Sequence, residues 1–581
     1  MFPAVSYRGQ ITYMKFLSAK ILNTDLSFFY SGFFLSLLVF LYIIPILGLF
    51  AGVSISSIYF PLALTLGNFF FIYLSRKSFS VSEVVINVIV LNTLIAVAYL
   101  ISIRVLDTSY DGLWYHQPAV VKLADGWNPI YNPNYEINQY DKTNFLWIQH
   151  YPKSAWIMGA CIYKASGQIE SAKLINFITI FCVFFYSYHV FSSFFKKHIF
   201  YSIGFSLLVS LNPVAVAQLL SNYVDGIIAG MLSLITLALL NLEFQNGRLA
   251  KLNWFVLGSS IIIVTNLKFT GLFMAGIVIG IFSLYWWWKR EPWKLIFRRY
   301  LWIFAIAATS FFVLGFNPYV INYTRYGHVF YPLNLKEQYA VFEQNEPVML
   351  RGRSAVEKFF ISLSSETINN IQTKNIPWKN PLSVTRKDIR AFAGTDVRIA
   401  GLGPLFLLAL ILSIAAFLAT FYKMSKSYKS ILLVVVISIL VSVVSVPLAW
   451  WARYTPQFFL FPLLLLAFSL ITAENQGLRV RKYLSMTAFF ILLLNLSIVA
   501  VPNVIANRIK TKLIRKEMSE LRSRKTPLLI NFSSTEFQAL RIRLKEANVS
   551  FTDCDTLKTN VQELRSIYNL YGYGPLYNKG D

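Results

Sequence analysis

Charged residues are scarce in this sequence, and their scarcity excludes an ordinary soluble protein. Asp, Glu, Lys and Arg make up only 14% of the 581 residues, whereas a soluble protein carries about 25%. Apolar residues make up 56%, and the mean hydropathy is +0.54. A single soluble core stops growing at about 250–300 residues, so this much apolar sequence must face lipid.

Cysteine is also rare, which excludes a disulfide framework. The three cysteines, Cys161, Cys182 and Cys554, are scattered along the chain. No His, Cys, Asp or Glu residues stand at the spacing of a metal site. The sequence therefore predicts no bound cofactor and no metal ligands, and it leaves open whether a divalent cation assists through a substrate phosphate.

Acidic residues are outnumbered by basic ones, 27 to 53, which gives a net charge of +26. Such a charge suggests nucleic acid as a partner, but no recognition motif for nucleic acid is present. In membrane proteins Lys and Arg gather in cytoplasmic loops for topological reasons. The charge therefore predicts an orientation in the membrane, with no nucleic acid as partner.

Long apolar runs, in contrast, are abundant. The stretches 26–52, 431–449 and 484–501 each reach the length of about 20 residues that a helix needs to cross the hydrocarbon core. Only helices and closed barrels pair all their backbone groups in lipid, and barrel strands alternate in polarity every second residue. These runs do not alternate. The sequence therefore predicts an all-α polytopic membrane protein.

We predict about thirteen membrane-spanning helices. They are 26–52, 58–75, 83–104, 171–195, 199–219, 222–242, 253–267, 269–288, 300–317, 401–421, 431–449, 455–472 and 484–502. Basic clusters occupy every second boundary between them: 76–77, 196–197, 248–251, 289–299, 423–429 and 479–482. With the N-terminus in the cytoplasm all six clusters lie inside, as the positive-inside rule requires. The first span has no cleavage site, so we expect an uncleaved anchor.

Three segments on the outer side of this topology are long. They are a first loop of about 105–170, a second loop of about 318–400, and the tail 503–581. In the tail, 528–532 and 549–551 are typical of strands, and Ser534-Thr535-Glu536 is typical of a helix start. We predict a transmembrane domain over 1–502 and a small α/β domain over 503–581 outside the membrane.

The first loop combines acidic and aromatic residues with a histidine. Asp107 and Asp111 lie just past the outer end of a span, and Tyr115-His116 follows them. Partial burial would make either aspartate a general base toward an incoming hydroxyl. Alternatively, both aspartates merely cap turns or helices. A histidine in this position is more often structural than catalytic.

The stretch 110–118 resembles the first periplasmic loop of bacterial GT-C superfamily glycosyltransferases, relatives of the protein O-mannosyltransferases and the lipid A aminoarabinose transferases. Those loops carry an aspartate, then aromatic residues, a Tyr-His pair and a proline. Later segments resemble the family in the same order, and together they cover about residues 80–475. These segments are Tyr151-Pro152, Leu267-Lys268-Phe269-Thr270, Asn317-Pro318-Tyr319, 327–333 and Arg453-Tyr454.

The resemblance implies a GT-C-like fold in the bacterial inner membrane with the C-terminal domain periplasmic or extracellular. It implies transfer of a sugar from a polyprenyl-phosphate donor to a cell-envelope glycan or lipid at the periplasmic face. Asp111 would be the general base, with Asp107 as second candidate and His116 beside them. The chain departs from the protein mannosyltransferases at Gly112, where they carry a second acid, and this disfavours a protein acceptor.

The resemblance also implies cationic partners for the donor phosphate. Lys268 and Arg453 lie at outer helix ends and are the first candidates, with Arg325 as a weaker one. Arg offers a bidentate fork to phosphate, and Lys offers a point charge. The alternatives are a snorkelling side chain for Lys268 and a place in the interfacial aromatic belt for Arg453.

Two other functions stay open. An O-antigen-type polymerase or ligase uses polyprenyl-pyrophosphate-linked chains and depends on outer-loop arginines, for which Arg351 and Arg353 are candidates. A lipid or glycan transporter usually shows internal repeats and interrupted helices in both halves. The chain has one such interrupted pair, at 253–288, without a partner.

Overall fold

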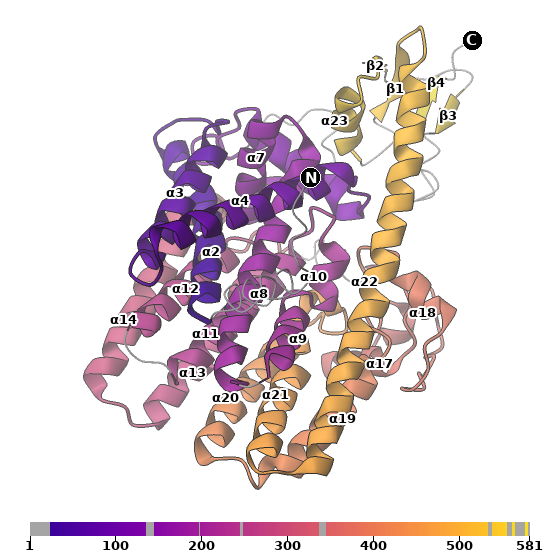
Figure 1. Cartoon of the computed structure of the whole chain (residues 1–581). Helices are drawn as coiled ribbons and strands as arrows, with labels where there is room; N and C mark the ends of the chain where they lie inside the picture. The colour runs from indigo at the N-terminus through magenta and orange to yellow at the C-terminus, as the bar shows by residue number, and fades with distance from the viewer. Residues whose placement is uncertain are drawn as a thin grey trace, which may run out of the picture.

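The structure is a computed structural model in which most of the chain folds into a helical bundle. It describes residues 24–134, 144–196, 198–244, 248–335, 344–532, 537–554, 561–563 and 576–578. The long helices run roughly side by side, and a small unit of strands lies at one end of the bundle (Figure 1).

Nine of the described helical segments are long and apolar enough to cross a membrane. They are α2 (Thr24–Phe50), α4 (Val81–Arg104), η2 with α8 (Ile169–Lys173 and Leu174–Phe194), α11 (Asp225–Leu242), α13 (Phe269–Trp288), α14 with η3 (Trp293–Ala308 and Thr309–Leu314), α20 (Lys426–Val444), η7 with α21 (Pro456–Phe459 and Leu460–Asn475) and α22 (Arg479–Arg522). Four shorter apolar helices accompany them: α3 (Tyr59–Ser75), α9 (Ile199–Ser210), α12 (Arg248–Thr265) and α19 (Phe406–Phe421). Each predicted span overlaps one of these helices, which confirms a polytopic helical membrane protein. The predicted span 199–219 is shorter than expected, because α9 ends at Ser210 and a separate short helix follows from Pro213 to Gln218.

Burial separates the central helices from those at the periphery. The apolar window of η7 and α21 is buried over 100% of its residues, whereas that of α14 and η3 is buried over 11%. The helix α11 is also central and packs against α8, α12 and α13. A broad exposed apolar surface such as that of α14 marks contact with lipid.

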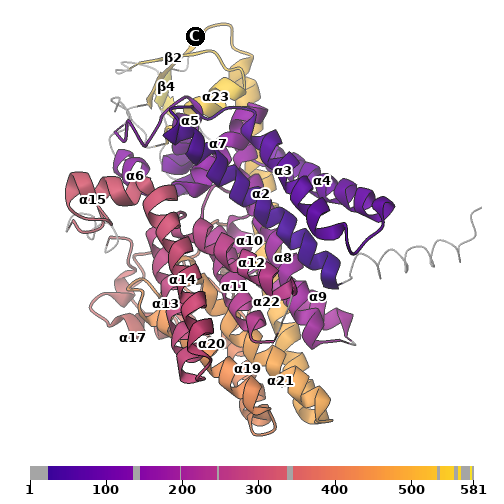
Figure 2. The same cartoon turned by 90° about the vertical axis from the view of Figure 1, so that its left-hand side faces the viewer.

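The N-terminal helices form a group on one side of the bundle. The helix α2 packs against α3 and α8, and α3 packs against α4 (Figure 2). At the start of α4, the Ser80 hydroxyl accepts from the Glu83 N–H and the Glu83 carboxylate accepts from the Ser80 N–H. This capping box satisfies two backbone donors that a helix start leaves unpaired. The helix then runs to Arg104 and leads directly into the first loop.

Short helices give the two long loops a defined structure. The first loop contains η1 (Gly112–His116), α5 (Gln117–Ala124), α6 (Phe145–His150) and α7 (Ser154–Ser166). The second contains η4 (Phe316–Val320), α15 (Ile321–Tyr326), η5 (Val348–Leu350), α17 (Ala355–Ser364) and α18 (Arg386–Ala391). Two further connections contain α10 (Pro213–Gln218) and η6 (Ala452–Tyr454).

A buried lysine ties the first loop to the second. Lys153 Nζ donates to the carbonyl oxygens of Gln149 and Tyr151, each at 2.8 Å, and to Asn317 Oδ1 at 2.6 Å. Three acceptors match the three protons of an ammonium group, although burial lowers the pKa of Lys153 well below its usual value. Ser154 N–H donates to the Asn266 carbonyl at 2.8 Å, which joins the same loop to the turn between α12 and α13.

The C-terminal strands form a four-stranded sheet in the order β2-β1-β4-β3. β1 (Leu528–Asn531) is parallel to β2 (Phe551–Asp553) and antiparallel to β4 (Leu576–Asn578), which is antiparallel to β3 (Val561–Glu563). The helix α23 (Ala539–Glu546) packs beside them. We refer to β1–β4 and α23 as the C-terminal unit. The predicted helix start at Ser534-Thr535-Glu536 lies outside the described residues.

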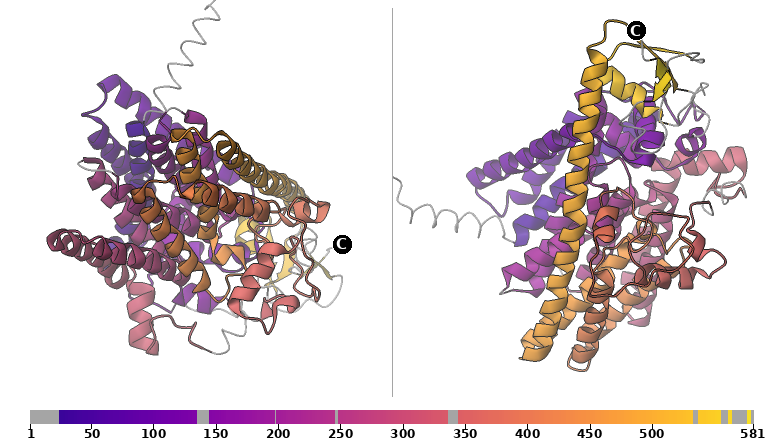
Figure 3. Two further views of the ribbon diagram at one scale, coloured as in Figure 1. Left: turned by 90° about the horizontal axis from the view of Figure 1, so that it is seen from below. Right: turned by 90° about the vertical axis from the view of Figure 1, so that its right-hand side faces the viewer.

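The predicted domain boundary at 502–503 falls inside a helix. The helix α22 passes through Pro502 and ends only at Arg522, along the whole height of the molecule (Figure 3). Proline removes one backbone hydrogen bond within a helix. Beyond it, Asn503, Asn507, Thr511, Ile514, Met518 and Leu521 are buried at helical spacing. Their contacts along one face hold the helix together, so the C-terminal unit begins after Arg522.

Candidate active site

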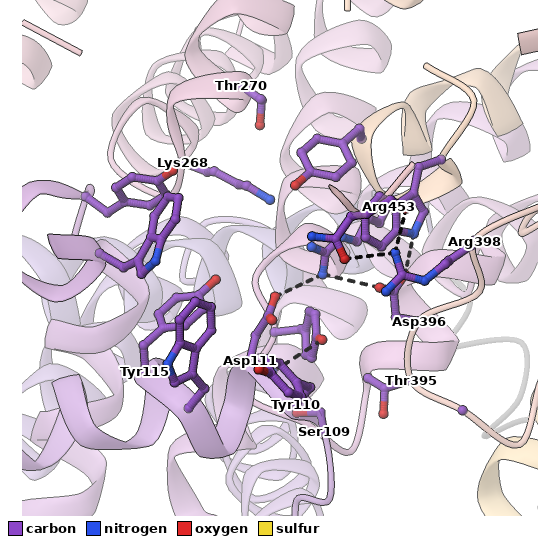
Figure 4. Close-up of a pocket in the computed structure, with 18 of the residues that line it drawn as sticks. Ser109, Tyr110, Asp111, Tyr115, Lys268, Thr270, Thr395, Asp396, Arg398 and Arg453 are labelled. Carbon is purple, nitrogen blue, oxygen red and sulfur yellow. Dashed lines mark hydrogen bonds and ion pairs between the residues drawn. The ribbon is translucent and has the colours of Figure 1, made fainter. Parts of the chain in front are cut away.

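A cavity of about 740 Å³ lies at the end of the bundle that carries the two long loops. Its walls come from the first loop, the turn between α12 and α13, the second loop, η6 and α22 (Figure 4). Aromatic rings form much of the lining: Tyr110, Trp114, Tyr115, Trp147, Tyr151, Tyr223, Phe269, Trp451 and Tyr454. Ligand pockets typically have volumes of about 300–1,000 Å³ and largely apolar walls with a few polar groups.

Asp111 projects into this cavity from the residue just before η1 (Figure 4). Its Oδ2 accepts from Arg453 Nη1 at 3.0 Å, and its N–H donates to the Tyr223 hydroxyl at 3.4 Å. The side chain is 14% exposed. A carboxylate that is partly buried, held in place and open to a cavity meets the geometric requirement for a general base.

Arg453 reaches the cavity from η6, between α20 and α21. Its Nη1 also lies 3.5 Å from Asp396 Oδ2, and its guanidinium lies 4.3 Å from the centre of the Trp451 ring and 5.3 Å from that of Tyr223. Burial lowers the pKa of Arg453, but the neighbouring carboxylates, Asp396 first, turn the net shift well upward. Arg453 is therefore a permanent cation that is shared between two acids.

Lys268 forms a second cationic point on the wall of the cavity. It is the N-cap residue of α13, and its Nζ donates to Asp225 Oδ1 at 2.7 Å and lies 4.5 Å from the centre of the Tyr454 ring. Asp225 Oδ2 accepts in turn from Gln218 Nε2 at 3.1 Å. Asp225 is 2% exposed and does not line the cavity, so it acts on the site through Lys268.

Three charged residues of the lining were not predicted from the sequence: Asp396, Arg398 and Lys510. Asp396 Oδ1 accepts from Trp451 Nε1 at 2.7 Å, and burial raises the pKa of this carboxyl group. Arg398 Nη1 donates to the Asn345 carbonyl at 3.1 Å, and its guanidinium lies 4.6 Å from the centre of the Trp451 ring. Lys510, on α22, donates to the Ala393 carbonyl at 3.3 Å. For Lys510, the available signal was the helical spacing of the apolar residues 514, 518 and 521, which indicates that a helix continues beyond Pro502.

The lining is positive on balance. Its charged side chains are Lys268, Arg398, Arg453 and Lys510 against Asp111 and Asp396. Cations confined among low-dielectric aromatic walls concentrate anions at a site. Asp225 neutralises Lys268 in part, which still leaves an excess of positive charge for an anionic ligand.

Asp107 lies behind the cavity wall and is fully buried. Its Oδ1 accepts from the Ser109 N–H at 2.8 Å and from the Ser109 hydroxyl at 2.6 Å. Its Oδ2 accepts from the N–H and the side-chain amide of Asn222 at 2.7 and 2.8 Å. A Cβ atom at Gly112 would collide with this carboxylate and with the Ser109 hydroxyl. Asp107 therefore braces the turn that presents Asp111, and glycine at 112 is a steric requirement.

The other two residues singled out from the sequence do not line the cavity. His116 is 3% exposed, and its Nδ1 accepts from Trp156 Nε1 at 2.7 Å. Burial lowers the pKa of His116 to about 4, so the ring is neutral at pH 7 and supports the loop. Arg325 is exposed on α15. Within the described residues, no three His, Cys, Asp or Glu side chains lie close enough together to hold a metal ion.

Comparisons with known proteins add only remote similarity in structure. No protein-family model matches the chain, and no curated protein is similar to it in sequence. Among solved structures, ArnT from Cupriavidus metallidurans bound to undecaprenyl phosphate aligns with a TM-score of 0.41 and 10% sequence identity, over 84% of this chain and 88% of that chain. A similarity at this level does not decide function.

Proposed function

We propose that this chain is a GT-C-type glycosyltransferase that uses a polyprenyl-phosphate sugar as donor at the periplasmic face of the bacterial inner membrane. The acceptor is a hydroxyl group of a cell-envelope glycan or lipid. The observation that carries the proposal is the position of Asp111, which faces a cavity at one end of the helical bundle with Lys268 and Arg453 on its walls. Transfer of a sugar from a phosphate to a hydroxyl group requires a base for the hydroxyl proton and cations for the departing phosphate.

The apolar tail and the anionic phosphate of the donor each have a suitable environment, the lipid around the bundle and the cationic cavity wall. A polyprenyl tail is apolar and partitions into the lipid around the bundle, while the phosphate is anionic and needs cations. Arg453 supplies a planar fork and Lys268 a point charge. Aromatic rings such as Tyr151 and Trp147 offer flat surfaces for a sugar ring. The volume of about 740 Å³ accommodates the sugar phosphate together with the acceptor group.

The reaction is an inverting displacement at the anomeric carbon. The acceptor oxygen attacks this carbon while Asp111 takes the hydroxyl proton, and the bond between the carbon and the phosphate oxygen breaks. Negative charge grows on the departing polyprenyl phosphate, where Arg453 and Lys268 stabilise it. Fixed cations placed where charge develops contribute strongly to lowering a barrier. Product release leaves a protonated Asp111, which returns its proton to water.

The direct test is consumption of radiolabelled polyprenyl-phosphate sugars by membranes that contain the wild type, Asp111→Asn or Asp107→Asn. We expect Asp111→Asn to lose activity by at least about 100-fold, the lower range for a general base, while the protein inserts and accumulates normally. Asp107→Asn loses an acceptor for Asn222 and is expected to reduce accumulation. Full activity in Asp111→Asn, or no consumption of any lipid-phosphate sugar by the wild type, would refute the proposal.

A further inference from the structure

The C-terminal unit packs directly against the segment that carries Asp111. Leu113 is fully buried in a hydrophobic cluster formed mainly by that unit and the end of α22. The ring of Tyr110 meets the ring of Phe537 edge to face, with 5.3 Å between their centres. Tyr110 also lines the cavity. The residues on both sides of Asp111 and Gly112 are therefore held by a part of the chain more than four hundred positions away in sequence.

A buried ion pair from the same unit fixes the peptide groups of Asp107. Arg543, on α23, is 4% exposed, and its Nη2 donates to the Asp107 carbonyl at 2.7 Å and to Glu170 Oε1 at 3.0 Å. Glu170 Oε2 accepts from the Asp107 N–H at 2.9 Å and lies 2.6 Å from Lys173 Nζ. Arg543 and Glu170 thus bind the carbonyl and the N–H of one residue, four positions before Asp111.

Two further hydrogen bonds extend this contact, one at Leu106 and one at the start of η2. The Leu106 N–H donates to the Thr511 hydroxyl of α22 at 3.0 Å, next to Lys510 on the cavity wall. The Ile169 N–H donates to Glu546 Oε1 of α23 at 2.7 Å. Two backbone N–H groups, which need a partner when buried, thus donate to side chains of α22 and α23.

We infer that the C-terminal unit is an integral part of the active site, and that Arg543 is a positioning residue that sets Asp111 for proton transfer. The inference rests on the proposed function, because it assigns the role of Arg543 through Asp111. An error of about 1 Å in the position of a reacting group costs about 100-fold in rate. The buried guanidinium of Arg543 binds the Asp107 carbonyl, and this fixes the turn that carries Asp111 and avoids such an error. The donor cations Lys268 and Arg453 belong to other elements and have partners besides Asp111, since Lys268 pairs with Asp225 and Arg453 also lies 3.5 Å from Asp396.

Removal of Arg543 still leaves Glu170 with a cationic partner. Glu170 keeps Lys173 as its ion-pair partner, and methionine replaces the apolar stem of the arginine. The severe cost of an unpaired buried charge is thereby avoided. A matched control lies on the same helix, where Arg541 is 22% exposed and pairs with Asp553 at 2.9 Å within the C-terminal unit.

The experiment compares Arg543→Met, Arg543→Lys and Arg541→Met in the full-length protein by two measurements. Amide hydrogen exchange reports the order of residues 105–113 without any need for activity. Steady-state rates with a polyprenyl-phosphate sugar separate kcat from the donor KM. We expect Arg543→Met to speed exchange in 105–113 and to lower kcat by about 10–100-fold with the donor KM changed less than about threefold. Arg543→Lys restores part of both effects, and Arg541→Met changes neither.

Two outcomes would overturn the inference. One is unchanged exchange at 105–113 in Arg543→Met. The other is an equal change in Arg541→Met, which would mean that the C-terminal unit affects stability alone. A wild type that consumes no polyprenyl-phosphate sugar would instead refute the proposed function. The exchange measurement would then still decide whether Arg543 orders the segment that carries Asp111.

Discussion

Asp111 Oδ2 and Arg453 Nη1 lie 3.0 Å apart although 342 positions separate the two residues in the chain. The pair joins the first loop to η6 and places the proposed base against a cation that suits a phosphate. Arg453 is also within 3.5 Å of Asp396. A donor phosphate that binds Arg453 therefore competes with both carboxylates, so donor binding and release of Asp111 to accept a proton are linked.

Replacement of Arg453 tests this link. We expect Arg453→Met to raise the donor KM by at least about tenfold, since a charge-assisted hydrogen bond contributes about 1.5–3 kcal/mol. Arg453→Lys should recover only part of the loss because lysine lacks the planar fork. Initial rates over a range of polyprenyl-phosphate sugar concentrations measure both effects. A wild-type donor KM in Arg453→Met would show that the phosphate binds elsewhere.

Lys268 and Asp225 are predicted to act as one unit. Asp225 does not line the cavity but holds Lys268 Nζ at 2.7 Å, so Asp225→Asn and Lys268→Met should each raise the donor KM. The double variant should be little worse than Lys268→Met alone, with a coupling free energy of about 1–3 kcal/mol. A double-mutant cycle on kcat/KM gives this value. Additive losses would assign Asp225 a role that does not pass through Lys268.

Three arginines on the surface separate the proposed transferase from a polymerase or ligase. Arg325, Arg351 and Arg353 are exposed and do not line the cavity. For a transferase that works at Asp111, each single change to methionine should leave kcat/KM within about twofold, because an exposed charge contributes little. The same radiolabel assay measures this. Loss of activity in Arg351→Met or Arg353→Met would favour the polymerase or ligase, and loss in Arg325→Met would extend the donor site to α15.

The membrane spans followed from the sequence because lipid imposes a strict requirement on them. Long apolar runs and alternating basic clusters predicted a helix at each of these places, including the division of the apolar stretch 253–288 into α12 and α13. A lysine at the centre of one long span costs about 2.5–3.5 kcal/mol, and the structure indeed has Lys268 at the N-cap of α13, where that cost does not arise.

The details of the site depended on contacts that no local pattern encodes. Asp107 and Asp111 look alike in sequence, and they differ because Asn222 binds the first and Arg453 the second. Asp396 and Arg398 lie in a loop segment without periodicity. The extension of α22 was missed because Pro502 suggested a break, and because polar residues such as Asn503 and Asn507 occupy the buried face where apolar ones are expected.

His116 gives the fold a predictable sensitivity to acid. Burial lowers its pKa from 6.5 to about 4, so the unfolded chain takes up a proton below about pH 6.5 and the folded chain does so only near pH 4. The stability that the neutral ring contributes is therefore complete above pH 6.5 and is lost as the pH falls toward 4. At about 1.4 kcal/mol for each pH unit, the loss by pH 5 is about 2 kcal/mol.

His116→Asn removes this titration and keeps an acceptor for Trp156 Nε1. We expect the thermal midpoint of the detergent-solubilised wild type to fall more between pH 7 and pH 5 than that of His116→Asn. Part of the dependence should remain in the variant, because burial also lowers the pKa of His150 to about 4. His328→Asn is the matched control, since His328 is exposed and should retain the full wild-type dependence. An equal fall in the wild type and in His116→Asn would mean that His116 takes up its proton at the same pH in the folded chain as in the unfolded chain. His116 would then be a candidate for proton transfer. A ring that stays neutral down to about pH 4 instead only supports the loop that carries Asp111.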